Sequence, residues 1–353
     1  MIAREGTRLK ATAPRTGDMS AHLTLRASAG SLETMPPETP MIGLGDILAA
    51  REVIAGRVHR TPTAKTGYLG DRAGVRLLLK LELFQRTGSF KPRGVLNRLH
   101  HLRPDERRKG VITLSAGNHA QALAWGASQA GISSTVVMPA KAPRAKIDAA
   151  RGYGAQVVLT DGDLLATCQA IQKERDLVLV HPFDDPWIIA GQGTVGMEII
   201  EEAPNPDAVI IGVGGGGLIS GIAVAVKGVR PLASVFGVEP EGACAMTRSL
   251  ERGEPVRLDR VETIADGLAA PFAGRLTLAH VRAFVDGMVT VTDRQIVEAM
   301  GLILERCKVV AEPAAAATVA ALLSGKLDRL RGATVVCVLS GGNVDRERLR
   351  TLL

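Results

Sequence analysis

The sequence predicts an α/β protein built on parallel β-sheets. Short apolar segments typical of buried strands alternate with segments of helical periodicity, as expected when helices connect parallel strands. One such segment, residues 208–213, runs directly into four glycines and then a helix. The composition agrees, because 46% apolar residues and 39 glycines are typical of α/β enzymes. The 353 residues can form one large or two ordinary domains.

Composition also excludes several classes of protein. No apolar run approaches the roughly 20 residues that a membrane-spanning helix needs. The net charge of +7 comes from clusters of mixed sign, and 3% aromatic residues offer few stacking rings, so we expect no nucleic-acid partner. A mildly basic body instead suits an anionic cofactor and substrate. The scattered cysteines predict reduced core thiols and a cytoplasmic location; they are Cys168, Cys244, Cys307 and Cys337.

Residues 1–40 are rich in Ala, Ser, Thr and Pro and show no periodicity. They lack the continuous apolar core of a secretory signal. We therefore expect a disordered tail, or a translation start placed too early, outside the fold. A short amphipathic helix is predicted over residues 42–57.

A polar segment around Lys91 follows the apolar strand predicted at residues 77–79. Ser89 is a suitable N-cap, Pro92 is tolerated in a first helical turn, and apolar residues continue at helical spacing. Lys91 would then lie in the first turn, where the helix dipole disfavours a cation and lowers the pKa of the amine. Such a lysine suits Schiff-base chemistry, whereas charge alone would favour an ordinary surface lysine.

The remaining elements are predicted in chain order. The first half has strands at 111–114, 135–139, 155–160 and 177–180, a helix from residue 119 to about 131 and another containing Lys146. The second half has helices at 193–202, from Leu218, at 293–307 and at 313–324. Its strands are at 208–213, 234–238 and 334–339, and residues 245–290 are expected to be irregular.

The glycines at 214–217 predict an anion-binding loop. Successive backbone amides and a helix N-terminus converge there, and side chains would obstruct the approach of a phosphate. The same segment also fits a dinucleotide fingerprint through Gly212, Gly214 and Gly217, with Glu239 near the position of a ribose-binding acid. A nicotinamide-linked oxidoreductase therefore stays open on this segment alone.

Many short motifs in the chain resemble, in order, those of the serine/threonine dehydratase family, which is pyridoxal-phosphate-dependent and of fold type II. The resemblance covers about residues 41–353 and gives a role to segments that the dehydrogenase alternative leaves without one. The motifs are Ser-Phe-Lys at 89–91, Ser-Ala-Gly-Asn-His at 115–119, His-Pro-Phe-Asp at 181–184, Gly-Gln-Gly-Thr at 191–194, the glycines at 214–217, Ala-Asp-Gly at 265–267, Glu-Pro at 312–313 and Ser-Gly-Gly-Asn at 340–343.

The resemblance implies a tryptophan synthase β-like fold with two parallel-sheet α/β domains and the cofactor between them. The large domain would comprise residues 41–112 and 187–353, and the inserted small domain residues 113–186. Lys91 would hold pyridoxal phosphate as a Schiff base and remove the substrate's α-proton. The other implied cofactor contacts are Phe90 beside the ring, Asn118 on the phenolic oxygen, Gly214, Gly215, Gly216, Gly217 and Leu218 on the phosphate, and Ser340 at the pyridine nitrogen.

The substrate carboxylate would meet the turn formed by Ser115, Ala116, Gly117, Asn118 and His119, with Gly267 nearby. Glu312 would lie near the cofactor, either with a chemical role or as a structural helix cap. Some relatives bind a divalent cation through positions that match Glu239 and Ala243, but the third ligand position here is Ala245. A divalent or monovalent cation is therefore an open expectation.

The implied reaction is elimination from L-threonine or L-serine to a 2-oxo acid and ammonia. Ser340 in place of an aspartate weakens the electron sink, which favours elimination over transamination. Ala116 stands where racemising relatives carry a serine, which argues against serine racemisation. Hydroxyaspartate or another 3-substituted amino acid is the alternative substrate. We expect a homodimer or homotetramer, and no response to isoleucine because the resemblance covers a catalytic domain only.

Overall fold

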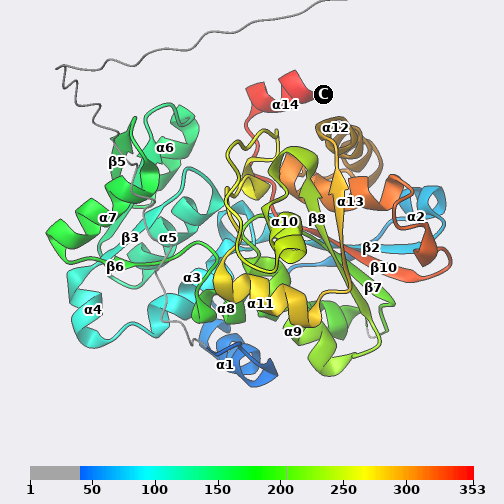
Figure 1. The fold of residues 1–353 in the computed structure, drawn as a ribbon, viewed down its shortest axis with the longest axis horizontal. Coiled ribbons are helices and arrows are strands. Elements are labelled where there is room, and N and C mark those ends of the chain that lie inside the picture. The colour runs from blue at the N-terminus through cyan, green and yellow to red at the C-terminus, as the bar shows by residue number, and fades with distance from the viewer. Residues whose placement is uncertain (1–39, 204) are drawn as a thin grey trace, which may run out of the picture. The chain divides into compact units, whose positions relative to one another are not determined.

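The computed structural model describes residues 40–203 and 205–353, so nearly all of the predicted N-terminal tail lies outside it. The described chain contains two β-sheets (Figure 1). Every strand pair in them is parallel except β1 with β2, which confirms the predicted parallel α/β class.

The larger sheet has six strands in the order β1-β2-β10-β7-β8-β9. Their bounds are β1 Thr63–Lys65, β2 Arg76–Leu81, β10 Thr334–Leu339, β7 Ala208–Gly212, β8 Ser234–Pro240 and β9 Gly287–Val291. The smaller sheet has four strands in the order β5-β4-β3-β6. Their bounds are β5 Gln156–Thr160, β4 Ser134–Pro139, β3 Val111–Leu114 and β6 Val178–Leu179.

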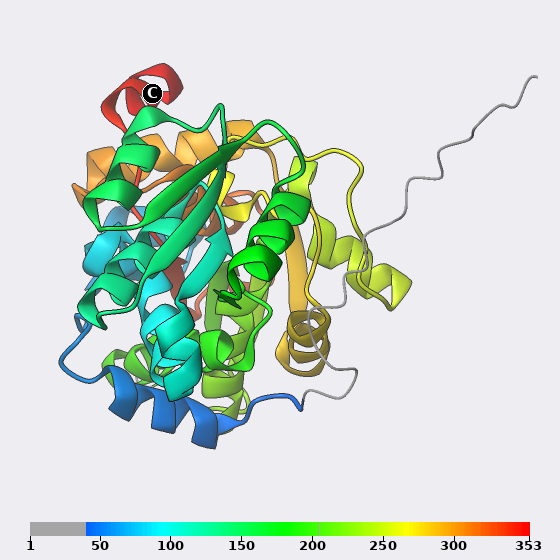
Figure 2. The same cartoon turned by 90° about the vertical axis from the view of Figure 1, so that its left-hand side faces the viewer.

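Helices connect the strands and cover both sheets (Figures 1 and 2). Around the smaller sheet lie α4 Pro104–Lys109, α5 Asn118–Gln129, α6 Arg144–Gly152 and α7 Leu164–Arg175. The others are α1 Leu44–Ile54, α2 Gly67–Ala73, α3 Lys91–His100, α8 Pro186–Glu202, α9 Gly217–Val229, α10 Ala245–Arg252, α11 Arg275–Phe284, α12 Asp293–Leu302, α13 Pro313–Leu323 and α14 Arg346–Leu352. None in the described part of the chain is long and apolar enough to cross a membrane.

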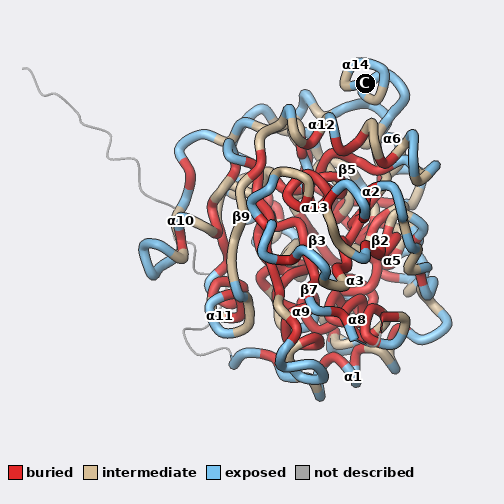
Figure 3. The backbone as a smooth tube through the Cα atoms, turned by 90° about the vertical axis from the view of Figure 1, so that its right-hand side faces the viewer, coloured by how far each residue is buried: buried red, intermediate tan, exposed pale blue. Residues whose placement is uncertain are grey.

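The core of the large sheet follows the two-residue periodicity of its strands. In β10, Val335 and Cys337 pack on the face covered by α2, α12 and α13, whereas Val336 and Val338 pack on the face covered by α8, α9 and α11. Both faces are buried, so the strands read as continuous apolar runs. Figure 3 shows this buried interior beneath an exposed outer layer of loops and helix faces.

Three predictions about elements were wrong. Helix α8 begins at Pro186 rather than 193, because the Asp185 carboxylate caps it by accepting from the N–H groups of Trp187 and Ile188. Residues 245–290 are not irregular throughout, since they contain α10, α11 and β9. The helix predicted over residues 293–307 is α-helical only as far as Leu302, and Ile303–Cys307 form one π-helical turn.

The smaller sheet is formed by residues 111–179, within the predicted inserted domain and its edges. Helices α5 and α6 pack on one face of it, and α7 packs on the other. The exact domain limits at 113 and 186 stay a prediction. The start of α5, from the small sheet, lies beside the segments that follow β2 and β10 of the large sheet, because Asn118 is hydrogen-bonded to Asn343 and α5 contacts residues 86–88.

Candidate active site

Lys91 begins α3, as the sequence predicted, and its side chain is half-buried. Its Nζ donates a hydrogen bond to the Pro182 carbonyl oxygen at 2.9 Å and lies 5.0 Å from the centre of the Phe90 ring. Burial lowers the pKa of Lys91 to about 8, even though the nearby Glu312 carboxylate acts to raise it. At a pKa of about 8, roughly a fifth of this amine is neutral and nucleophilic at pH 7.4, far more than for an exposed lysine.

Ser89 does not cap α3, contrary to the sequence prediction. Phe90 is the N-cap residue, while Ser89 is extended and forms an isolated bridge with Gly341. The Phe90 N–H also donates to the Ser340 carbonyl oxygen at 3.1 Å. This backbone pairing fixes the Lys91 segment against the end of β10, and the buried Ser89 hydroxyl has no partner among the described residues.

The glycine loop joins β7 to α9 and is almost entirely buried. The backbone N–H groups of residues 214–219 have no hydrogen-bond acceptor among the described residues. A Cβ at Gly216 (φ 96°) would lie 2.6 Å from Met246 Cε and 2.8 Å from Thr277 Cβ, and one at Gly215 would strike the Phe183 ring. These buried, unpaired amides at a helix N-terminus are arranged as an anion cradle would require, and the predicted phosphate contacts stay a prediction.

The segment His181–Asp184 connects Lys91 to the glycine loop, a role that sequence reasoning missed. Pro182 receives the Lys91 hydrogen bond, and Phe183 packs on Gly215 and Gly217. The Asp184 carboxylate accepts from the Thr277 N–H at 3.0 Å, and the Thr277 hydroxyl in turn donates to the Gly215 carbonyl oxygen at 2.7 Å. The motif His-Pro-Phe-Asp marked this segment in the sequence. Its role was missed because the segment contacts residues that are far from it in the chain.

The turn between β3 and α5 forms a second cluster of free amides. The Gly117 N–H donates to the Ser115 hydroxyl at 3.1 Å, whereas the N–H groups of Ala116, Asn118 and His119 have no acceptor among the described residues. Such a turn at the start of a 12-residue helix suits an anionic group such as a carboxylate.

Asn118 lies in a chain of side-chain hydrogen bonds. Its Nδ2 donates to Glu312 Oε1 at 2.8 Å, and its Oδ1 accepts from Asn343 Nδ2 at 2.8 Å. Burial raises the pKa of Glu312 to about 7, although the hydrogen bond from Asn118 acts to lower it. Glu312 is the N-cap residue of α13, but its side chain makes no capping hydrogen bond and faces Asn118 instead, so both the chemical and the capping alternatives stay open.

Ser340 and Gly267 lie beside these groups. Ser340 follows β10 and is 5% exposed, and the next residue, Gly341, is so close to Glu312 that a Cβ there would lie 2.6 Å from Oε1. Gly267 lies in a short 3-10 helix, Asp266–Leu268, and its carbonyl oxygen is 3.2 Å from where Gly214 would carry a Cβ. The structure thus gathers the predicted cofactor and substrate residues into one region.

The two buried histidines of this region act as neutral structural groups. Burial and the Lys91 charge lower the pKa of both His119 and His181 to about 3. The His119 Nε2 faces the Val180 carbonyl oxygen at 3.2 Å, and the His181 Nδ1 accepts from the Asp184 N–H at 2.8 Å. Neither side chain is placed as an acid or base, which leaves His119 only its backbone N–H for a substrate.

Glu239 and Ala243, the predicted cation ligands, lie near the end of β8 and in the 3-10 helix that follows it. Both Glu239 oxygens are engaged at the start of α10, where they accept from the N–H groups of Met246 and Thr247 and from the Thr247 hydroxyl. Ala243 ends a 3-10 helix, Glu241–Ala243. The described residues include no group of three or more His, Cys, Asp or Glu arranged to hold a metal ion. The cation site stays a prediction.

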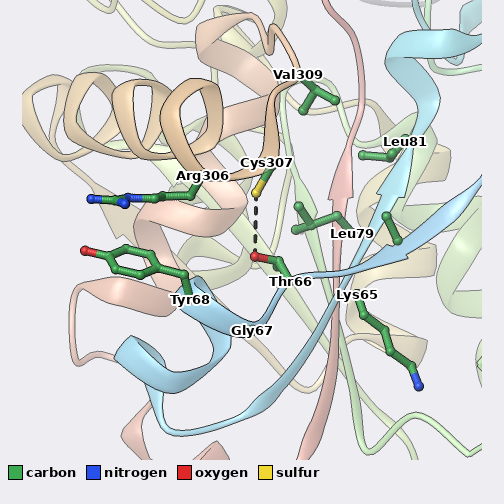
Figure 4. Close-up of a pocket in the computed structure, with 10 residues that line it drawn as sticks. Lys65, Thr66, Gly67, Tyr68, Leu79, Leu81, Arg306, Cys307 and Val309 are labelled. Atoms are coloured by element: carbon green, nitrogen blue, oxygen red, sulfur yellow. Dashed lines mark hydrogen bonds between the residues drawn. The ribbon is translucent and has the colours of Figure 1, made fainter.

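A separate cavity of about 230 Å³ lies between β1, β2, α2 and the π-helical turn (Figure 4). The Cys307 thiol faces the Thr66 hydroxyl across it at 3.6 Å, and the Arg306 guanidinium stacks over the Tyr68 ring at 4.4 Å. None of the predicted cofactor or substrate residues lines this cavity. The unpaired amides and the low-pKa lysine, rather than the volume of a cavity, identify the site.

Comparison with known proteins gives matches over most of the chain. A family model described as pyridoxal-phosphate dependent enzyme matches residues 54–341. The L-threonine ammonia-lyase of Thermotoga maritima is 46% identical over 86% of this chain and 76% of its own length. The catabolic L-threonine dehydratase TdcB of Escherichia coli K12 is 42% identical over 87% of this chain and 95% of its own. The structure of maize serine racemase superposes with a TM-score of 0.85 at 37% identity, covering 88% of this chain and 97% of that one.

Proposed function

Because the chain belongs to the family of pyridoxal-phosphate-dependent enzymes, we propose that it converts L-threonine and L-serine to the 2-oxo acid and ammonia. The fold is fold type II of that class, and the cofactor is pyridoxal phosphate. The observation that carries the proposal is the position of Lys91, an amine of lowered pKa that lies between two separate sets of free backbone amides.

The residues present fit this cofactor. The buried N–H groups of residues 214–219 lack acceptors in the protein, and a phosphate would satisfy them. The Lys91 amine is the group that holds an aldehyde cofactor covalently. Phe90 would lie beside the ring, Asn118 would donate to the phenolic oxygen, and the Ser340 hydroxyl would meet the pyridine nitrogen. When bound, pyridoxal phosphate supplies an aldehyde that condenses with amines and a ring that withdraws electrons.

The protein's own groups divide the remaining work. The free N–H groups of Ala116, Asn118 and His119 bind the substrate carboxylate and orient its Cα. Lys91 Nζ, with a pKa of about 8, takes up the α-proton, since a base is most effective when its pKa is near the working pH. Ser340 offers a neutral hydroxyl rather than a carboxylate, which favours prompt loss of the β-hydroxyl over a long-lived carbanion.

Replacement of Lys91 tests this assignment. We expect Lys91→Ala to abolish 2-oxo acid release from L-threonine and the absorbance of the covalently held cofactor, because the covalent link and the base are lost together. The fold should persist, as judged by circular dichroism. Lys173→Ala, which changes an exposed lysine on α7, is the control and should match the wild type. Turnover by Lys91→Ala near the wild-type rate would rule the assignment out.

The alternative substrate is hydroxyaspartate or another 3-substituted amino acid. It would use the same Lys91 chemistry and differ only in the group that faces the β-substituent. A substrate panel monitored for 2-oxo acid release separates these alternatives, and we expect threonine and serine to lead it.

We also propose that the enzyme forms a homodimer or homotetramer in the cytoplasm. Tyr68, Phe84 and Val310 are 46%, 49% and 40% exposed and are apolar side chains that a second copy could cover. All four cysteines are free, which suits a reducing compartment. Light scattering of the purified protein tests the oligomeric state.

A further inference from the structure

We propose that Asn343 is a positioning residue, which orients the side-chain amide of Asn118 so that one of its N–H groups stays free for the cofactor. This inference rests on the proposed function and deepens it. It gives a role to the last residue of the Ser-Gly-Gly-Asn motif, for which the sequence offered only a position in the chain.

Asn343 connects three segments that are distant in sequence. Its Nδ2 donates to the Thr87 carbonyl oxygen at 2.7 Å and to Asn118 Oδ1 at 2.8 Å. The Gly342 N–H adds a hydrogen bond to the Gly88 carbonyl oxygen at 2.9 Å. Gly88 has no side chain, and a Cβ there would strike the Asn343 carboxamide. The loop that leads to Lys91 is thus shaped to receive Asn343.

This geometry determines which way each amide faces. The orientation of an Asn side chain is normally inferred from its hydrogen-bond partners. Here a backbone carbonyl fixes it, because the Thr87 oxygen can only accept, so the atom of Asn343 that faces it must be the nitrogen. Both Nδ2 hydrogens of Asn343 are then used, one on Thr87 and one on Asn118. The atom of Asn118 that faces Asn343 must therefore be its oxygen.

The other end of the chain agrees with this assignment. With its oxygen toward Asn343, Asn118 directs Nδ2 to Glu312 Oε1 at 2.8 Å. That oxygen accepts when Glu312 is ionised, and it accepts as the carbonyl oxygen when the other oxygen carries the proton. If Asn118 were reversed, its nitrogen would face the Asn343 nitrogen, and two donors would meet. Its oxygen would face the Glu312 oxygen at the other end. Thr87 and Glu312 therefore hold the two amides in one orientation from both ends.

The consequence concerns the second Nδ2 hydrogen of Asn118. One hydrogen goes to Glu312, and the structure gives the other no acceptor among the described residues. Asn118 can thus donate one hydrogen bond into the site in the orientation that Asn343 imposes. A donor on the phenolic oxygen favours its ionised form and so lowers the pKa of the bound chromophore.

The variant Asn343→Asp tests the inference. It keeps the shape of the side chain but replaces the donor by acceptors, so that Asn118 is driven to turn its nitrogen toward position 343. The matched control is Asn97→Asp on α3. Asn97 Nδ2 also donates to a backbone carbonyl, that of Trp187, at the same 2.7 Å, but it does not contact Asn118. Each variant loses a hydrogen bond from a side-chain nitrogen to a backbone carbonyl oxygen and places a carboxyl group beside that oxygen.

The readouts separate positioning from stability. For Asn343→Asp we expect the dissociation constant of pyridoxal phosphate from the apoprotein to rise about tenfold or more, as for loss of a charge-assisted hydrogen bond. The pKa of the bound cofactor, from absorbance against pH, should rise as well. Asn97→Asp should lower the melting temperature while leaving that pKa and the dissociation constant within about twofold of the wild type.

Equal cofactor titration curves for Asn343→Asp and the wild type would overturn the inference. If that variant does not fold, Asn343→Ala removes the same donor without adding charge and carries the same expectations. Should neither fold, a neutron structure of the wild-type holoenzyme decides, because it locates the amide hydrogens directly and must show Asn343 Nδ2 bonded to Asn118 Oδ1. Failure of the proposed function would look different, because the wild type itself would then bind no pyridoxal phosphate or release no 2-oxo acid from threonine.

Discussion

Ala116 is the residue at which we expect elimination and racemisation to diverge. It lies in the turn whose free N–H groups suit the substrate carboxylate, and its side chain is a methyl group with no donor or acceptor. With Lys91 as the base on one face of the substrate Cα, reprotonation from the opposite face needs a second acid. A methyl group cannot supply it, so the wild type should produce little D-serine.

We expect Ala116→Ser to gain measurable serine racemisation or D-serine elimination while keeping activity on the L-substrates. General acid–base groups within hydrogen-bond reach are typically worth roughly 10²–10⁴-fold, so even an imperfectly placed hydroxyl should be detectable. Chiral chromatography of L-serine reactions compares the two proteins. Abundant D-serine from the wild type would mean that another residue donates to that face, and no gain in the variant would mean that the turn does not aim position 116 at the substrate.

At the scale of single residues, the sequence predicted groups that the structure brings together and missed most of the residues that hold them in place. Lys91, Asn118 and the glycine loop follow from local motifs and are brought together by the fold. Phe183 and Thr277 could not be assigned, because their contacts with Gly215 depend on chain segments 32 and 62 residues from it, as the structure shows. Ser89 was assigned the wrong role because its pairing with Gly341 overrides its local preference for a cap.

At the scale of elements, a buried ionic cluster fixes α3 to its neighbours. Arg93, two residues after Lys91, is fully buried and bonds Glu82 at 2.7 Å after β2 and Glu198 at 2.7 Å in α8. The Lys80 ammonium bonds the same Glu198 at 2.8 Å. Since buried charges are tolerated only when paired, this cluster sets where the first turn of α3, and hence Lys91, lies relative to the large sheet.

Replacing Arg93 by methionine should therefore lower the free energy of unfolding by about 3–5 kcal/mol, because Glu82 would be left as an uncompensated buried charge. Urea denaturation of the apoprotein measures the loss. The control is Arg60→Met, which breaks ion pairs with Glu201 and Glu202 at a side chain 51% exposed, and should cost less than about 1 kcal/mol. An equal loss of unfolding free energy in the two variants would show that the buried cluster contributes no more to stability than the exposed ion pairs.

Strands were easier to predict than helix boundaries for a physical reason. Strands buried on both faces must be apolar throughout, so β3, β7 and β10 stand out in the sequence. Helix α10 was missed because its start is stabilised by the Glu239 side chain from β8 rather than by a local cap. Helix α8 was predicted to start too late because its glycines looked like breakers, although Gly193 is required where α8 packs against Ile47 and α9.

At the scale of the whole described chain, the site is made by two sheets that must stay in register. The turn that we propose binds the substrate carboxylate belongs to the small sheet, whereas the glycine loop, Gly267 and Ser340 belong to the large one. One ion pair joins the two sides close to the substrate residues. Lys146 Nζ in α6 lies 2.9 Å from the Asp266 carboxylate, the residue before Gly267, and the two side chains are 22% and 66% exposed.

We expect Lys146→Met to change KM for threonine more than it changes stability. An exposed pair contributes at most about 1 kcal/mol, which limits the rise in KM to about fivefold and the change in melting temperature to a few degrees. Salt should raise KM for the wild type by screening the pair and should have little effect on the variant. Lys227→Met, which breaks a 2.8 Å pair with Asp286 inside the large-sheet region, should leave KM unchanged. An equal KM for Lys146→Met and the wild type at low salt would mean that the two sheets keep their register without this contact.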